Sequence, residues 1–199
     1  MINGINSREM ILEILLEIEE GEHSHVAIRN ALSKYQFLPK QDRAFITRVC
    51  EGTLEYRIQI DYIINSFSKV TVDKMKPAIR EILRSAVYQL KYMDSVPDSA
   101  VCNEAVKLAQ RKGFYNLKPF VNGVLRTIAR EMDQVRFPQK EDDLLKYLSV
   151  KYSMPEVLVT RWLEAYGEET TEKILADFLM EHPLTIRCQI GRASCRERV

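Results

Sequence analysis

The chain has 199 residues, of which 46% are hydrophobic and 29% are charged. These values are typical of a globular protein and exclude the disordered and fibrous classes. The 29 basic and 28 acidic side chains give a net charge of +1, which points to no particular partner. Only seven glycines and seven prolines are present, and this scarcity of turn-forming residues predicts an all-α protein.

Apolar residues recur at helical spacing in seven segments of the first 137 residues. We expect Asn6 to cap the first helix, Gly21 to end it, and Asp98 to cap the sixth. Gly52 lies inside the third helix at a cost of about 1 kcal/mol relative to alanine, which predicts a close helix crossing there. The seven helices should form a bundle; they cover about 6–20, 24–35, 40–56, 58–67, 77–93, 98–112 and 119–128.

The remaining residues form a second unit with a different charge. Residues 1–137 hold 20 basic and 17 acidic side chains, whereas residues 138–189 hold 6 and 10. Within the second unit we expect helices at 144–152, 155–166 and 169–180, and an extended segment at 182–187. The sequence therefore predicts a helical bundle at 1–137 followed by a helical linker at 138–189. Residues 190–199, with three arginines and a cysteine, resemble a non-native tail, although a native basic tail is the alternative.

A basic segment is the strongest sign of a binding function. Between residues 107 and 136 there are seven cations and two anions, interleaved with Phe114, Tyr115 and Phe120. Cations can follow phosphates, and aromatic rings can stack on unpaired bases. The alternative is a solvated helical face whose cations are drawn to a helix end. The candidate RNA-binding residues are Lys107, Arg111, Lys112, Lys118, Arg126 and Arg130.

No motif predicts catalysis in this chain. Gly-rich phosphate loops, GxSxG and HExxH are all missing, so we name no catalytic residue. His23 and His25 have no third ligand nearby, and we expect no metal site. We expect Asp42 and Arg43 to form a buried ion pair that fixes two helices, although an anion site at the helix start is the alternative.

Cysteine usage and hydropathy indicate where the protein resides. No apolar run approaches the roughly 18 residues that a membrane-spanning helix needs, and residues 1–4 do not resemble a signal peptide. The four cysteines form no Cys-x-x-Cys pair, which suits a reducing compartment. We therefore expect a cytoplasmic protein with no membrane partner, and we expect Cys50 and Cys102 to be packed rather than reactive.

Three segments together resemble the NusB-type antitermination fold. They are Asp-Arg-Ala-Phe at 42–45 leading to Glu-Gly-Thr-Leu at 51–54, Val-Pro-Asp-Ser-Ala-Val-Cys-Asn-Glu-Ala-Val at 96–106, and Phe-Val-Asn-Gly-Val-Leu-Arg at 120–126. The resemblance covers about residues 5–135 and implies a compact helical RNA-binding module. In that setting Asn122 and Gly123 are expected to form a tight helix-packing site, and Asn103 and Glu104 a polar network.

The second unit is similar to the linker of the Sun/Fmu family. The resemblance rests on Tyr-Ser-Met-Pro at 152–155, Trp-Leu-Glu-Ala-Tyr-Gly at 162–167 and His-Pro-Leu-Thr-Ile-Arg at 182–187. Members of that family are rRNA methyltransferases that use S-adenosylmethionine (SAM) to make 5-methylcytosine in small-subunit rRNA. The resemblance implies that this chain docks small-subunit rRNA, with no DNA partner. It also implies a methyltransferase domain, joined in cis and absent from this sequence, that binds SAM.

The sequence departs from both families in ways that shape the hypotheses. None of its four cysteines follows a proline, as the methyltransferases' catalytic cysteines do, and no Gly-rich SAM loop is present. Free NusB proteins carry an Arg-rich start, whereas Arg8 is the only cation before Arg29 here, which moves the expected RNA surface to residues 107–136. Two alternatives are a stand-alone antitermination factor that binds RNA and a ribosomal protein, and a helical scaffold without an RNA role. An antitermination factor should end near residue 140.

Overall fold

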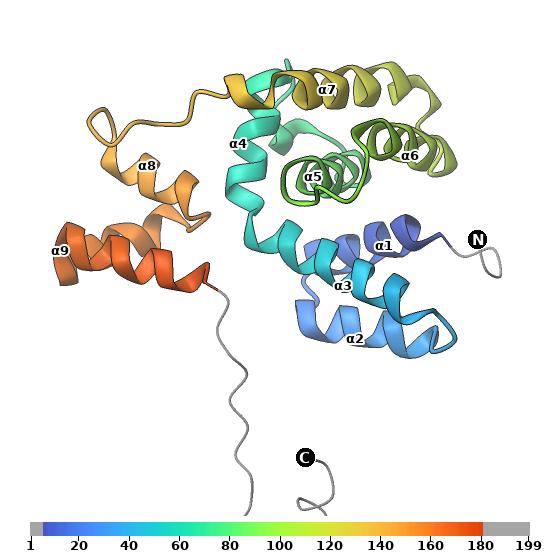
Figure 1. The fold of residues 1–199 in the computed structure, drawn as a ribbon, viewed down its shortest axis with the longest axis horizontal. Coiled ribbons are helices and arrows are strands. Elements are labelled where there is room, and N and C mark those ends of the chain that lie inside the picture. Colours follow the sequence, from blue (N-terminus) through green and yellow to red (C-terminus); the bar gives the residue numbers. More distant parts are fainter. Residues whose placement is uncertain (1–5, 181–199) are drawn as a thin grey trace, which may run out of the picture.

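The computed structural model of the chain describes residues 6–180 (Figure 1). All regular structure in this range is helical, so the predicted all-α class is confirmed. None of these helices is both long and apolar enough to cross a bilayer. The α-helices are α1 (Ser7–Glu19), α2 (Ser24–Lys34), α3 (Lys40–Glu55), α4 (Arg57–Phe67), α5 (Pro77–Tyr92), α6 (Asp98–Arg111), α7 (Lys118–Glu131), α8 (Leu144–Lys151) and α9 (Glu156–Phe178).

Local signals account for where these helices begin and end. The side chain of Asn6 accepts a hydrogen bond from the backbone N–H of Arg8 at 2.9 Å, which confirms the predicted cap of α1. Gly21 follows α1 with φ 111°, a conformation that glycine adopts without strain. The cap predicted for α6 is wrong by one residue, because Pro97 holds that position and Asp98 starts the helix. There the Asp98 carboxylate still faces the positive end of the helix dipole.

Helix α5 is the centre of the bundle. It packs against α1, α3, α4, α6 and α7, which surround it in Figure 1. Its apolar side chains, among them Ile79, Ile82 and Leu83, are almost fully buried. Several of its polar side chains are buried as well, because neighbours cover the helix on nearly every side. One continuous hydrophobic core therefore joins α1–α7.

A buried charge cluster lies where α4 meets α5. The guanidinium of Arg84 donates to both carboxylate oxygens of Asp61, at 2.7 and 2.6 Å, and to Glu81 at 2.5 Å. Arg84 is 3% exposed, so these bonds replace nearly all of its hydration. Such a cluster is stable only while each charge keeps its partners.

Gly52 lies at the crossing of α3 and α5, as predicted. A Cβ atom built at this position would overlap the ring of Tyr88, whose side chain packs directly on the α3 backbone. The missing side chain therefore provides the space for Tyr88.

Helices α8 and α9 form a small second unit. Their core consists of Leu148, Val159 and Leu175, with partly buried side chains packed around it. Gly167, with φ 74°, breaks the helical backbone between the two helices predicted at 155–166 and 169–180, so α9 consists of two helical segments, as predicted. The predicted extended segment at 182–187 and the tail at 190–199 lie outside the described residues, and the domain boundaries at 137 and 189 stay predictions.

The second unit meets the bundle along the start of α4. The side-chain amide of Gln59 donates to the carbonyls of Val150 and Lys151, both at 3.2 Å. The hydroxyl of Ser153 accepts a bond from the backbone N–H of Ile58 at 3.1 Å. The connecting segment is fastened by Tyr62, whose hydroxyl donates to the Arg136 carbonyl at 2.7 Å. These bonds hold α8 against α4.

Candidate functional site

The first half of the predicted basic surface is partly neutralised. Lys112 Nζ lies 3.0 Å from Glu13 Oε1 and 3.5 Å from Glu9 Oε1, and both carboxylates belong to α1. Arg111 is 3.9 Å from Glu9. Lys107 pairs with Glu104 at 2.7 Å. These three cations are therefore less available to phosphates than a count of charges suggests.

Helix α7 carries the less neutralised half of that surface. Lys118 and Arg126 are exposed, and neither forms an ion pair with any residue in the described range. Arg130 is exposed too, but it pairs with its neighbour Glu131 at 2.6 Å. Tyr115, in the 3-10 turn just before α7, exposes 67% of its surface. Exposed cations can hold phosphates, and an exposed ring on the segment that leads into the same helix can stack a base.

Asp42 and Arg43 do not form the predicted ion pair. The guanidinium of Arg43 donates to the backbone carbonyl of Leu32 at 3.0 Å and thereby ties α3 to α2. Asp42 is only half-buried and makes no ion pair within residues 6–180. The Arg43 guanidinium is engaged by the Leu32 carbonyl of α2 instead of the Asp42 carboxylate.

The roles implied for two other residue pairs hold only in part. A Cβ added at Gly123 would meet no atom within 4 Å, so the expected tight packing at Asn122 and Gly123 is wrong at the glycine. Glu104 does belong to a charge network: the hydrogen bond from Lys107 lowers its pKa, with further contributions from Arg8 and Arg111. Asn103 is exposed and lies outside that network.

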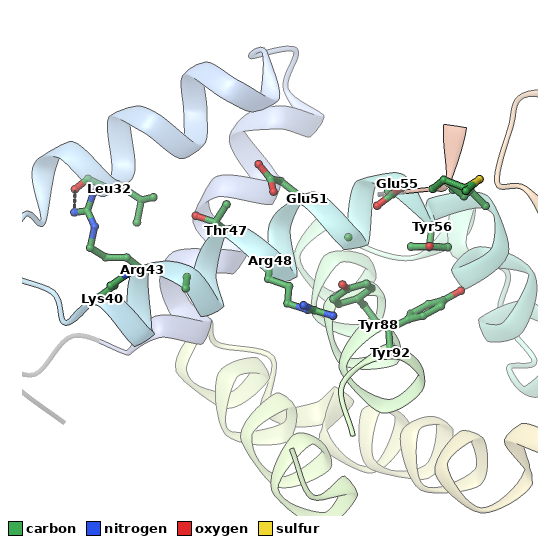
Figure 2. Close-up of a pocket in the computed structure, with 14 residues that line it drawn as sticks. Leu32, Lys40, Arg43, Thr47, Arg48, Glu51, Glu55, Tyr56, Tyr88 and Tyr92 are labelled. Atoms are coloured by element: carbon green, nitrogen blue, oxygen red, sulfur yellow. Dashed lines mark hydrogen bonds between the residues drawn. The ribbon is translucent and has the colours of Figure 1, made fainter. Parts of the chain in front are cut away.

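A groove runs along α3 that was not predicted from the sequence. It has a volume of about 790 Å³ and is lined mainly by α3 and the C-terminal half of α5, with Leu32 of α2 and with Leu179 and Met180 directly after α9. In Figure 2 the cations Lys40, Arg43 and Arg48 come from the first part of α3 and the carboxylates of Glu51 and Glu55 from its last part. The polar face of α3, repeating every three to four residues, was the available signal. The groove itself depends on how α3 crosses α5, which the sequence does not display.

Three tyrosine rings form the inner end of this groove. The ring of Tyr92 lies 4.3 Å from that of Tyr56 and 5.3 Å from that of Tyr88, centroid to centroid, with interplanar angles near 30°. Burial raises the pKa of each of the three hydroxyls. Burial, followed by the charge of Glu51, also raises the pKa of Glu55. The tyrosines therefore stay neutral in the physiological range. Tyr88 is only 5% exposed, so the accessible aromatic surface belongs to the half-buried Tyr56 and Tyr92.

No catalytic centre emerges from the described residues. Cys50 and Cys102 are both buried free thiols. Burial raises the pKa of Cys50 to about 12, with a further contribution from Glu51, so no reactive thiolate forms there. A SAM site does not fit this part of the chain either, because the cofactor loop at a strand end has no counterpart among helices 6–180.

Comparison with known proteins connects this geometry to two groups. The "Probable ribosomal RNA small subunit methyltransferase B" of Bacillus subtilis is 34% identical over 190 residues, which are 96% of this chain and 42% of that protein. The "Transcription antitermination protein NusB" of Bacillus velezensis is 33% identical over 128 residues, which are 64% of this chain and 95% of that protein. This chain thus spans about two fifths of the length of the methyltransferase relative.

Solved structures share the fold. The crystal structure of PH0851 matches with a TM-score of 0.69 and 21% identity, over 90% of this chain and 40% of that one. The complex of antitermination factors NusB and NusE with double-stranded RNA matches with a TM-score of 0.57 and 21% identity, over 62% of this chain and 93% of that one. Residues 5–130 match the family described as the NusB family. The chain therefore belongs to the NusB family.

Proposed function

We propose that this chain is the RNA-docking part of a protein that methylates small-subunit rRNA. The observation that supports this most is the extent of similarity. The methyltransferase relative aligns with 96% of the chain, a share that requires α8 and α9, whereas the antitermination protein aligns with 64%. Helices α8 and α9 thus have counterparts in the methyltransferase but are not needed for the NusB match.

In this proposal the chain binds the rRNA, and another part of the protein catalyses the methyl transfer. When bound, SAM supplies the methyl group, and its site belongs to a methyltransferase domain in cis that is not part of this sequence. The bundle holds the RNA in the cytoplasm through the exposed cations of α7, chiefly Lys118 and Arg126, with Tyr115 as a stacking surface. Lys107, Arg111 and Lys112 contribute less, because Glu104, Glu9 and Glu13 already neutralise part of their charge.

Salt-dependent binding tests the proposal. Fluorescence anisotropy with labelled, transcribed small-subunit rRNA should give an affinity that falls steeply with salt, because each phosphate contact releases counterions. Replacing Lys118 and Arg126 with glutamine should lower the slope of log K against log salt by about 0.7–0.9 per lost contact. Lys69→Gln, at an exposed cation after α4, is the matched control and should change little. A flat salt dependence would favour the scaffold hypothesis instead.

Activity gives a second test. Purified chain mixed with rRNA and tritiated SAM should transfer no methyl group, since the described residues hold no catalytic centre. Incorporation of tritium into the RNA would overturn the assignment of this chain to docking alone.

A second candidate is a stand-alone antitermination factor that binds RNA and a ribosomal protein. It is favoured by the match to NusB proteins along nearly their whole length, and by the solved complex in which NusB and NusE bind RNA. Size-exclusion chromatography with purified NusE distinguishes the two candidates. A stable complex that also forms with a chain ending at residue 143 would favour antitermination, because α8 and α9 would then have no part in it.

A further inference from the structure

We infer that the groove along α3 binds an unpaired RNA nucleotide, with the phosphate at its cationic end and the base at its tyrosine end. This rests on the proposed RNA-binding function and adds a second contact region, on a different helix from the cations of α7. The groove is large enough for more than one nucleotide, with about 790 Å³ of space. From Arg43 to Glu55 it follows α3 for about 18 Å, at 1.5 Å per residue.

The cations at the first end are available to a phosphate. Lys40 and Arg48 are exposed and form no ion pair with any described residue, although Arg48 hydrogen-bonds the Tyr88 side chain. Arg43 uses one nitrogen for the Leu32 carbonyl at 3.0 Å and keeps its other donors. Figure 2 shows the Arg48 side chain reaching from α3 toward Tyr88. A phosphate beside Arg48 would therefore lie next to the aromatic end of the groove.

The tyrosine end suits a base. Tyr56, Tyr88 and Tyr92 form a connected aromatic cluster, and aromatic side chains stack on bases with about 1–3 kcal/mol per base. The cluster is preorganised: Tyr88 is held against Gly52, and the hydroxyl of Tyr92 donates to the side chain of Gln59. A base can therefore stack without first ordering the rings.

The two glutamates fix the direction in which a nucleotide lies. Glu51 and Glu55 are both exposed and follow Arg48 in the last part of α3. Two carboxylates repel a phosphate, so this end favours the uncharged base. The opposite end favours the phosphate because its cations have no carboxylate partner among residues 6–180. An unpaired nucleotide meets this separation of charge better than a duplex, whose bases are stacked inside and whose phosphates lie outside.

Binding of a fluorescein-labelled single-stranded octamer of cytidine tests the inference. Arg48→Gln should weaken binding about fivefold and lower the salt slope by about 0.7, the value for one phosphate contact on a single strand. Tyr56→Ala should weaken binding about tenfold, in line with the loss of one stacked base, whereas Tyr56→Phe keeps the ring and should bind as the unmodified chain does. Lys69→Gln is the control for a lost surface cation.

Crosslinking keeps the test valid if a tyrosine variant unfolds. Ultraviolet irradiation of the unmodified chain with the same octamer, then trypsin and mass spectrometry, should attach nucleotide to peptides 49–57 or 85–91, which contain Tyr56 and Tyr88. RNA binding with crosslinks only elsewhere, together with unchanged affinity of Arg48→Gln, overturns the groove and leaves the proposed function standing. If the chain binds neither the octamer nor rRNA, both inferences fail.

Discussion

The bundle and the α8–α9 unit are both helical, but they reach stability in different ways. The bundle encloses α5 almost completely and buries a large set of apolar side chains. The α8–α9 unit has three fully buried core residues, and Tyr166 and Phe178 on α9 remain more than half exposed. Apolar burial is the main stabilising contribution to folding, so the second unit depends more on ion pairs and on its seam with α4.

The single tryptophan makes this contrast measurable. Trp162 lies on α9 and stacks on Phe178 with ring centroids 5.7 Å apart. Tryptophan fluorescence therefore reports on the α8–α9 unit, whereas far-ultraviolet circular dichroism is dominated by the longer bundle.

The largest loss of folding stability is expected from Arg84→Leu, a substitution that affects the bundle only. The substitution leaves the Asp61 and Glu81 carboxylates without their shared partner, and breaking a buried charge cluster from one side costs about 3–5 kcal/mol. Urea unfolding followed by circular dichroism should show this loss. If the midpoint changes by less than that of a surface variant such as Lys69→Gln, the cluster does not stabilise the bundle.

Two glycine substitutions within the bundle should change its stability by intermediate amounts. Gly52→Ala forces a methyl group into the ring of Tyr88, and overpacking of this kind costs about 1–3 kcal/mol. Gly123→Ala places the same methyl group in open space, and should stabilise α7 by up to about 1 kcal/mol through helix propensity. Thermal unfolding should therefore shift in opposite directions, and equal shifts would contradict the close crossing at Gly52.

The smallest loss of stability is expected at acidic pH, and the α8–α9 unit should be destabilised before the bundle. Hydrogen bonds from Lys140 and Lys151 lower the pKa of Glu172 to about 2, well below the value near 4.3 of an unfolded chain. The stabilisation is therefore complete above about pH 5 and is lost as the pH falls through 4.3 toward 2. Trp162 fluorescence should change in that window, and Glu172→Gln should remove most of the dependence. An unaltered acid transition in that variant would exclude this residue as the cause.

Much of the fold follows from local patterns in the sequence. The helices of the bundle lie within a few residues of their predicted bounds because apolar periodicity and caps act over short distances. The close crossing at Gly52 is predictable from the cost of a glycine inside a helix, but this signal is not general, because Gly123 inside α7 has open space around it. By contrast, Lys112 lies 99 residues from Glu13 along the chain, so no local pattern reveals that this cation is already paired. The groove along α3 could not be predicted for the same reason, since Tyr56 and Tyr88 come together only through the crossing of α3 and α5.

The contact between α4 and α8 affects which residues of the protein can be substituted during evolution. Gln59 binds the carbonyls of Val150 and Lys151, and Ser153 binds the N–H of Ile58, so each of these bonds uses a main-chain group on one side. Main-chain groups persist through almost any substitution. The exposed side chains of α8 can therefore be substituted during evolution, while Gln59 and Ser153 preserve the alignment of the two units.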